Sequence, residues 1–102
     1  MNAEARVATG NASHYIKVLC NHFGRKVSAE FTATQGSVQF PFGVCQLSGD
    51  PEELVLRVQA DNDQQLAQLK GVVGEHLEKF ARRGEVITVV WQDALAITPA
   101  EQ

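Results

Sequence analysis

The stretch that decides the fold is ELVLRVQADNDQQLAQLKGVVGEHLEKF, residues 53–80, because its hydrophobic period changes from two residues to about 3.6 along the way. Its first half predicts a strand with one apolar face, made of Leu54, Leu56, Val58 and Ala60. Its second half predicts a helix with Asp61 as N-cap and an end at Arg82, Arg83 and Gly84. The apolar stripe of this helix consists of Leu66, Leu69, Val73, Leu77 and Phe80.

A second amphipathic helix is predicted upstream, over residues 11–23. We expect Gly24 to end this helix in the left-handed conformation that favours glycine. Cations at Arg25 and Lys26 then follow where the negative end of the helix dipole favours them. The apolar stripe of the helix consists of Ile16, Leu19, Cys20 and Phe23.

Short strand-like runs lie between and after the helices. Residues 26–32 alternate between apolar and polar side chains. Residues 37–40 and 44–48 are predicted to form a tight hairpin, because the intervening Pro41 and Gly43 suit a type I turn. Residues 85–91, EVITVVW, are apolar enough to form a last strand that is covered on both faces or paired with a partner.

These elements predict an α+β fold. Short connections favour a mostly antiparallel sheet, and one apolar stripe per helix favours two helices on one sheet face. The result is a two-layer sandwich in the order α-β-β-β-β-α-β. The 102 residues fit one domain with one core, and we expect residues 1–8 and 93–102 to be flexible.

Composition limits the classes of function. With 44% apolar and 21% charged residues, the chain has the make-up of an ordinary globular domain. Its net charge of -3 disfavours nucleic-acid binding. No apolar run is long enough to span a bilayer, and the start does not resemble a secretory signal, so we expect no membrane partner and a cytoplasmic location. Cys20 and Cys45 fit that compartment as reduced thiols.

Cys20 and His22 stand two positions apart, but a helix turns them roughly 160° from each other, so they cannot share one metal ion. Cys20 is expected in the core, with a reactive thiol as the alternative. His22 shares a face with Tyr15 and lies in the last helical turn, where a protonated imidazole suits the dipole. His76 is expected to be partly buried with a hydrogen-bond partner. If the two helices pack side by side, both histidines lie near one seam.

Two further features of the sequence allow alternative interpretations. No acidic residue occurs between Glu4 and Glu30, although basic and imidazole side chains recur there, which indicates either a solvated basic helix or a patch that attracts anions. Gly71 and Gly74 lie inside the second helix, where each costs about 1 kcal/mol relative to alanine. They are either tolerated there, or they allow close packing on the first helix or on a second subunit.

Common catalytic and metal-binding motifs are absent, and the carboxylates are scattered over turns and helix ends. Two histidines near one seam make at most a weak metal site, because stable sites use three or four ligands. We therefore predict no catalytic residue, no metal ion and no cofactor.

Three blocks of the chain resemble a small bacterial domain family of unknown function: SHYIKVLCNHFGRKV (residues 13–27), GSVQFPFGVCQL (36–47) and VVGEHLEKFARRGE (72–85). The resemblance extends over about residues 5–91. Gly71 and Gly74 differ from the residues usual at their positions. The positions that carry the family's marked residues are Tyr15, Cys20, His22, Phe40, Phe42, Gly43, Cys45 and His76.

The resemblance implies a sheet carrying two helices, similar to the TATA-binding-protein-like or phosphohexomutase C-terminal arrangement. Members occur alone or joined to siderophore-interacting flavoproteins, which implies a role beside bacterial iron acquisition. Some relatives are labelled dihydroxyheptenedioate aldolase. Such aldolases resemble complete barrels of roughly 250 residues, so we do not expect that activity from this chain.

Our leading hypothesis is a non-enzymatic accessory domain that binds a small anionic or iron-chelate ligand, or a protein partner such as a siderophore-related flavoprotein. One alternative is a homodimeric interaction module that uses residues 85–91 and the two helix glycines. The other is a metal- or thiol-dependent enzyme that uses Cys20 or the histidine pair. The ligand-binding residues expected under the leading hypothesis are His22, Arg25, Lys26, Tyr15, Phe42 and His76.

Overall fold

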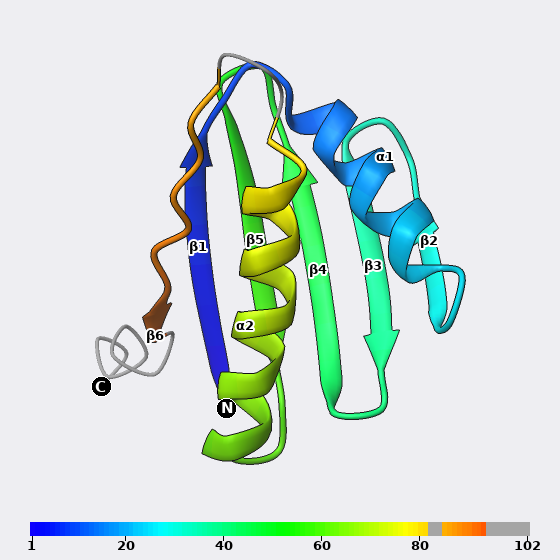
Figure 1. The fold of residues 1–102 in the computed structure, drawn as a ribbon, viewed down its shortest axis with the longest axis vertical. Coiled ribbons are helices and arrows are strands. Elements are labelled where there is room, and N and C mark those ends of the chain that lie inside the picture. Colours follow the sequence, from blue (N-terminus) through cyan, green and yellow to red (C-terminus); the bar gives the residue numbers. More distant parts are fainter. Residues whose placement is uncertain (82–84, 94–102) are drawn as a thin grey trace, which may run out of the picture.

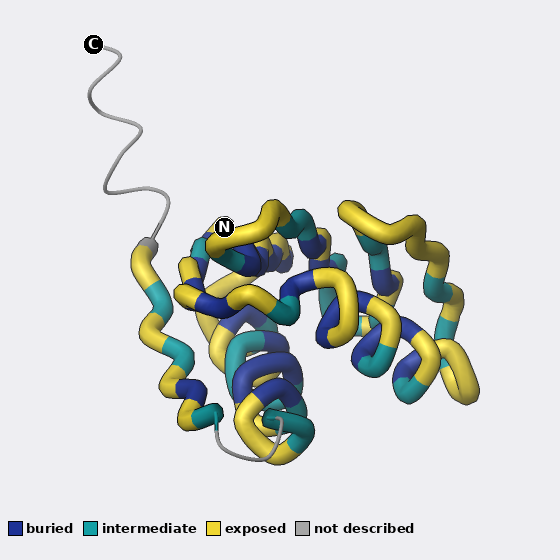
Figure 2. Tube along the Cα trace, turned by 90° about the horizontal axis from the view of Figure 1, so that it is seen from above, coloured by how far each residue is buried: buried dark blue, intermediate teal, exposed yellow. Residues whose placement is uncertain are grey.

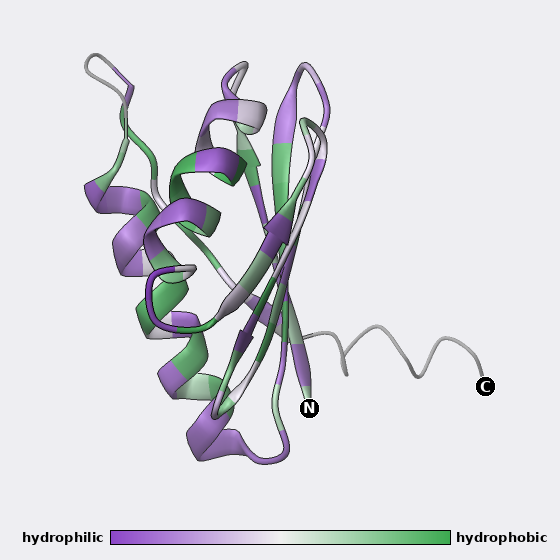
Figure 3. Cartoon of the chain, turned by 90° about the vertical axis from the view of Figure 1, so that its right-hand side faces the viewer, coloured by the Kyte–Doolittle hydropathy of each residue, from purple (hydrophilic) through white to green (hydrophobic). Residues whose placement is uncertain are grey.

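The computed structural model describes residues 1–81 and 85–93, which form an antiparallel six-stranded sheet with two helices on one face (Figures 1 and 3). This confirms the predicted α+β two-layer sandwich, with one strand added before the first helix. Within the described residues, neither helix is both long and apolar enough to cross a membrane. The elements are β1 (Asn2–Ala8), α1 (Ala12–Phe23), β2 (Ser28–Phe31), β3 (Gln35–Phe40), β4 (Gly43–Gly49), β5 (Glu53–Gln59), α2 (Asp63–Lys79) and β6 (Gln92–Asp93).

The expectation that residues 1–8 are flexible is wrong. They contain β1, which lies between β5 and β6 in the strand order β2-β3-β4-β5-β1-β6. Ala3, Ala5 and Val7 point into the core and are buried, while the residues between them face outward. Alanine is a weak strand former, so the segment depends on its full-length antiparallel pairing with β5, from Asn2↔Gln59 to Ala8↔Glu53.

The predicted meander is confirmed from β2 to β5, where each strand pairs with the next. The β3–β4 hairpin is as tight as expected, because Phe40 pairs directly with Gly43. Gly43 has a φ of 156°, and a Cβ there would stand 2.5 Å from the carbonyl oxygen of Gln59. Glycine is therefore required at this position by both backbone conformation and space.

Both helices occur where they were expected, but their caps differ. Gly24 has a φ of -63°, so it is right-handed, and the chain leaves α1 through a further turn in which Lys26 N–H donates to the Phe23 carbonyl at 3.0 Å. The N-cap of α2 is Asn62 rather than Asp61, because the Asn62 side chain accepts a hydrogen bond from the backbone N–H of Gln65 at 2.8 Å. The predicted helix end at residues 82–84, like the tail after Asp93, lies outside the described residues.

The core fills the space between the helices and the sheet, where buried residues gather (Figure 2). Helix α1 packs over β2, β3 and β4, whereas α2 packs over β4, β5 and β1. The predicted stripes of both helices face inward, except that Phe80 at the end of α2 stays half-buried. The fully buried large side chains include Tyr15, Ile16, Leu19, Leu54, Leu56, Leu69 and Leu77.

The last predicted strand, residues 85–91, does not form. These residues run beside β1 (Figure 1), but strand pairing with β1 is confined to Gln92 and Asp93. The backbone N–H of Val89 instead donates to the Glu78 carboxylate at 2.9 Å. Ile87 is buried and Val89 is half-buried, whereas Val86 is 92% exposed. The apolar run is therefore covered on one side within this chain.

Gly74 allows a close approach, but not by α1. A Cβ at Gly74 would lie 3.3 Å from Trp91 Nε1 and 3.6 Å from Val89 Cγ1, so the segment after α2 packs on this glycine. Gly71 has room for a Cβ, since the nearest atom would be a Glu75 oxygen at 3.9 Å. Both glycines line one hollow together with Val89 and Trp91, so they face the segment after α2 rather than α1.

Candidate functional site

His22 of α1 and His76 of α2 come together between the two helices. Their ring centroids lie 4.9 Å apart, and the ring planes are tilted by 41°. Both side chains are half-buried. This confirms the expectation that His22 and His76 lie near one seam between the two helices. We call this place the helix seam.

Phenylalanine rings contact both imidazoles. Phe23 contacts His76 at 5.0 Å between centroids, and Phe80 contacts His22 at 5.2 Å. Phe23 also contacts Phe40 at 5.0 Å, and Phe42 stacks on Phe40. Phe42 therefore belongs to the same ring cluster, but it reaches the histidines through Phe40 and Phe23, and it does not contact them as an expected ligand-binding residue would.

One nitrogen of His76 is already engaged. Its Nδ1 lies 2.7 Å from the backbone carbonyl oxygen of Val72, one helical turn earlier. A carbonyl oxygen only accepts, so Nδ1 must carry the proton that is donated. In the neutral ring the lone pair then resides on Nε2, which is the nitrogen left to bind another group.

The helix seam is cationic. Partial burial lowers the pKa of His22, and the positive charges of His76, Arg25, Lys79 and Lys26 lower it further. In the part of the chain that the structure describes, ion pairs form on the opposite side of the sheet and none involves these three long cations. The predicted Arg25 and Lys26 therefore act on His22 through their charges, and neither forms an ion pair with a described carboxylate.

Lys79 is a member of the seam that sequence reasoning missed. It stands three residues after His76 on α2, so the two side chains lie on one side of that helix. The helical spacing was visible in the sequence, but nothing in the sequence showed that this side of α2 would meet the end of α1. The helix seam is accordingly defined by five residues, namely His22, Arg25, Lys26, His76 and Lys79.

Tyr15 is not part of the seam. Its side chain is fully buried, and its hydroxyl donates to the Glu85 carboxylate at 2.5 Å. Thr9 and Asn11 donate to the same carboxylate at 2.5 Å and 3.1 Å. Tyr15 was expected from the sequence to bind a ligand, but its buried hydroxyl is bonded to Glu85 instead. Glu85 itself carries no sequence signal that would have linked it to Tyr15.

Both thiols are interior groups. Cys20 and Cys45 are each 2% exposed, which confirms that Cys20 belongs to the core. Burial raises the pKa of Cys20, and it raises the pKa of Cys45 to about 12 with a smaller contribution from Cys20. A thiolate nucleophile needs the opposite environment, with a lowered pKa and access to solvent.

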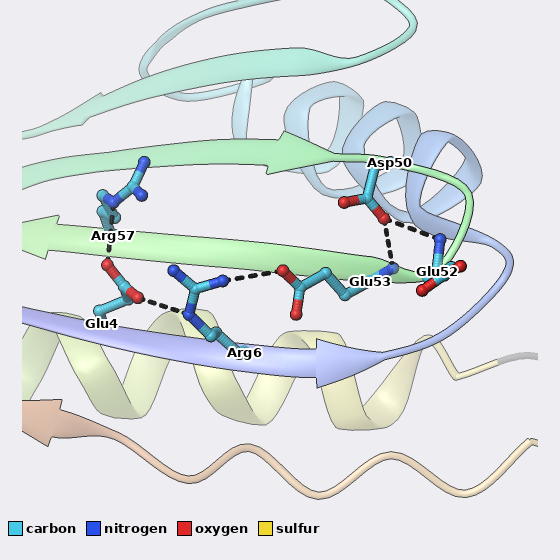
Figure 4. Close-up of polar contacts among 6 residues, drawn as sticks. All are labelled: Glu4, Arg6, Asp50, Glu52, Glu53 and Arg57. Atoms are coloured by element: carbon cyan, nitrogen blue, oxygen red, sulfur yellow. Dashed lines mark hydrogen bonds and ion pairs between the residues drawn. The ribbon is translucent and has the colours of Figure 1, made fainter.

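The outer face of the sheet carries an ion-pair ladder (Figure 4). Arg6 binds Glu4 at 2.9 Å and Glu53 at 2.8 Å, and Arg57 binds Glu4 at 3.0 Å. Burial acts to raise the pKa of Glu4, but the hydrogen bonds and charges of Arg57 and Arg6 together lower it. Two shallow hollows of about 430 Å³ and 210 Å³ meet at Gln46 and Arg57 on this face. Because its charges are paired with one another, this face attracts a charged ligand less than the helix seam does.

Comparison with known proteins places the chain among bacterial proteins without an assigned activity. A model of the family described as "Uncharacterized protein conserved in bacteria (DUF2218)" matches residues 4–92. The chain is also similar to a solved structure, described as the NMR structure of PA4090 from Pseudomonas aeruginosa, with 29% identity and a TM-score of 0.76. That similarity covers 91% of this chain and 96% of the other. No functionally curated protein matches the chain.

Proposed function

The chain belongs to the uncharacterised bacterial family DUF2218, and from that premise we propose that it is a small cytoplasmic binding module whose helix seam holds a small anionic ligand. One observation carries the proposal: the His22 and His76 rings lie 4.9 Å apart at a place where the charges of Arg25, Lys26 and Lys79 act on His22. Like charges gathered without carboxylate partners create a local positive potential, which attracts anions.

The seam suits binding better than catalysis. The described groups that act on the charge of His22 are all cationic, so a carboxylate that would orient an imidazole base is not among them. The thiols lie in the core and have raised pKa values. An anion, in contrast, would be stabilised by every charged group of the seam, and it would favour the protonated form of His22.

Iron chelates are the first class of anion to test. This part of the proposal is supported by the resemblance to domains that occur beside siderophore-interacting flavoproteins, and by the positive seam, since many chelates carry negative charge. A flavoprotein of that kind would be the partner that supplies or receives the ligand.

The proposal is tested by NMR titration of the protein with phosphate, citrate and a panel of ferric chelates. We expect signals of His22 and His76 to shift, and we expect Arg25→Ala or Lys79→Ala to weaken binding about fivefold, as the loss of roughly 1 kcal/mol implies. Lys17→Ala is the matched control, because Lys17 is an exposed cation of α1 whose charge is not among those that act on His22. Unchanged affinity in both Arg25→Ala and His22→Ala would refute the proposal.

A homodimeric interaction module is the second candidate, and one observation favours it. Val86 is 92% exposed and Val90 is 65% exposed, and both lie on the outer side of the segment that follows α2. A second copy of the chain would bury these side chains by placing the same segment against them. Sedimentation that shows a dimer in the wild type and a monomer in Val86→Lys would support this function, and a wild-type monomer at high micromolar concentration would exclude it.

A further inference from the structure

His76 is prepared to act as a ligand through one nitrogen. Its Nδ1 donates to the Val72 carbonyl at 2.7 Å, which fixes the ring and leaves the lone pair of the neutral form on Nε2. Histidines that bind metal ions commonly use this arrangement, in which one ring nitrogen binds the ion and the other donates to a backbone carbonyl or a carboxylate. The hydrogen bond therefore leaves Nε2 as the ring nitrogen that can bind another group.

The spacing of the two rings fits a shared ion. Two imidazoles that bind one tetrahedral ion have ring centroids roughly 5 Å apart, because each ligating nitrogen stands about 2.0–2.1 Å from the metal. The His22 and His76 centroids are separated by 4.9 Å. The two ring planes are tilted by 41° to each other.

We propose that His22 and His76 form a two-histidine site for a divalent late transition metal ion, such as Ni²⁺, Cu²⁺ or Zn²⁺, that arrives bound to a small anionic chelator. The inference rests on the proposed function, because it names the chemical class of the anionic ligand. Imidazole nitrogens suit these ions as well as iron, so the inference extends the proposed class of iron chelates to chelates of other metals. The site thus selects a metal chelate that still has two adjacent open positions.

The surroundings favour a chelate over the bare ion. Arg25, Lys26 and Lys79 make the seam positive, which opposes the approach of a free divalent cation and favours a complex with net negative charge. Among the described residues, no group of three or more histidine, cysteine, aspartate or glutamate side chains could hold a metal ion. The remaining coordination positions would therefore be filled by the chelator, whose carboxylates would face the three cations.

An incoming complex can reach both imidazoles. His22 and His76 are half-buried rather than enclosed, so part of each side chain stays exposed to solvent.

The test compares nickel nitrilotriacetate, nitrilotriacetate alone and nickel chloride as ligands in isothermal titration calorimetry. We expect the nickel chelate to bind the wild type more tightly than either component. His22→Ala and His76→Ala should each weaken this binding by at least about tenfold, the loss typical of disturbed metal sites. His14→Ala is the matched control, since His14 is the third histidine of the chain and is exposed on α1, and it should bind like the wild type.

A second measurement uses the wild type alone, so that it does not depend on the folding of variants. Paramagnetic copper nitrilotriacetate should broaden the imidazole NMR signals of His22 and His76 before those of His14. If nitrilotriacetate alone binds as tightly as its nickel complex, or if the copper chelate broadens all three histidines equally, the metal site is refuted while the anion-binding function stands. If neither the chelates nor any anion binds, both proposals fall.

Discussion

The hydroxyl of Tyr15 donates a hydrogen bond to the Glu85 carboxylate at 2.5 Å, and it thereby joins α1 to the chain that follows α2. Thr9 and Asn11 donate to the same carboxylate. One acidic side chain thus connects the β1–α1 junction with the segment that covers the core next to β1. The buried aromatic residue expected to bind a ligand instead holds two distant parts of the fold together.

Replacing Tyr15 by Phe should destabilise the fold. The hydrogen bond to a carboxylate is lost while the ring still fills the core, so we expect the free energy of unfolding to fall by about 1–3 kcal/mol in urea denaturation. His14→Ala, next to it but exposed, should leave the unfolding midpoint nearly unchanged. Equal midpoints for Tyr15→Phe and the wild type would show that the Tyr15–Glu85 bond contributes no stability.

Deleting residues 1–8 should abolish cooperative folding. The deletion removes the buried side chains of Ala3, Ala5 and Val7 and leaves one edge of β5 without its partner strand. We expect circular dichroism to show no sharp thermal transition, because domains of this size have only about 5–15 kcal/mol of stability. Arg6→Ser, which changes the exposed face of the same strand, should still unfold cooperatively. A deletion variant with a wild-type transition would mean that β1 is dispensable.

Gly36→Ala should lower stability, because α1 packs directly over this position of β3. A Cβ at residue 36 would lie 2.8 Å from Cys20 Sγ and 3.1 Å from Ile16 Cγ2. Overpacking of this kind costs about 1–3 kcal/mol, measured as the free energy of unfolding. Gly71→Ala is the opposite control: it adds a methyl group within α2 whose nearest neighbour, a Glu75 oxygen, stands 3.9 Å away, and it should stabilise by about 1 kcal/mol. Identical effects of the two substitutions would contradict the close packing of α1 on Gly36.

The thiols should resist modification while the protein is folded. Burial raises the pKa of Cys20, and it raises the pKa of Cys45 to about 12, so thiolate is scarce at neutral pH. A colorimetric thiol reagent should therefore react slowly with the native protein and rapidly after addition of guanidinium. Rapid labelling of Cys20 in the native state would instead support the reactive-thiol alternative.

Acidification should destabilise the protein through His22. Burial, and then the charges of His76, Arg25, Lys79 and Lys26, hold the pKa of His22 below its ordinary value of 6.5. The unfolded chain therefore binds this proton more readily than the folded protein does. The contribution of His22 to stability is complete above its ordinary pKa, and it decreases as the pH falls toward the folded-state pKa.

The measurement is the free energy of unfolding at several pH values between about 7.5 and 5, the range around the ordinary histidine pKa. His22→Gln should show a smaller decrease over this range than the wild type. His14→Gln serves as the control and should keep the wild-type slope. A steeper slope in His22→Gln would reverse the assigned direction of the pKa shift.

Local patterns predicted much of the architecture. The stripe through Ile16, Leu19 and Phe23 identified α1, and the stripe from Leu66 to Leu77 identified α2. The Phe40–Gly43 turn identified the central hairpin. Each of these signals arises from side chains within a few residues of one another, so the sequence itself contains the information.

The errors occurred where distant contacts outweighed local propensity. Residues 2–8 are rich in alanine and form a strand because β5 pairs with them. Residues 85–91 have high strand propensity, yet Val89 donates to Glu78 and packs on Gly74, which keeps this segment out of regular pairing with β1. Propensity differences of about 1 kcal/mol are too small to resist such contacts.

The sequence by itself determined two amphipathic helices, an antiparallel meander and a thiol that faces the core. Only the tertiary structure decided that His22 meets His76, that Lys79 joins Arg25 and Lys26, and that Tyr15 turns away from them to Glu85. The physical reason is that period and spacing fix which side of a helix is apolar, whereas the partner of each polar side depends on how α1 and α2 pack against the same sheet.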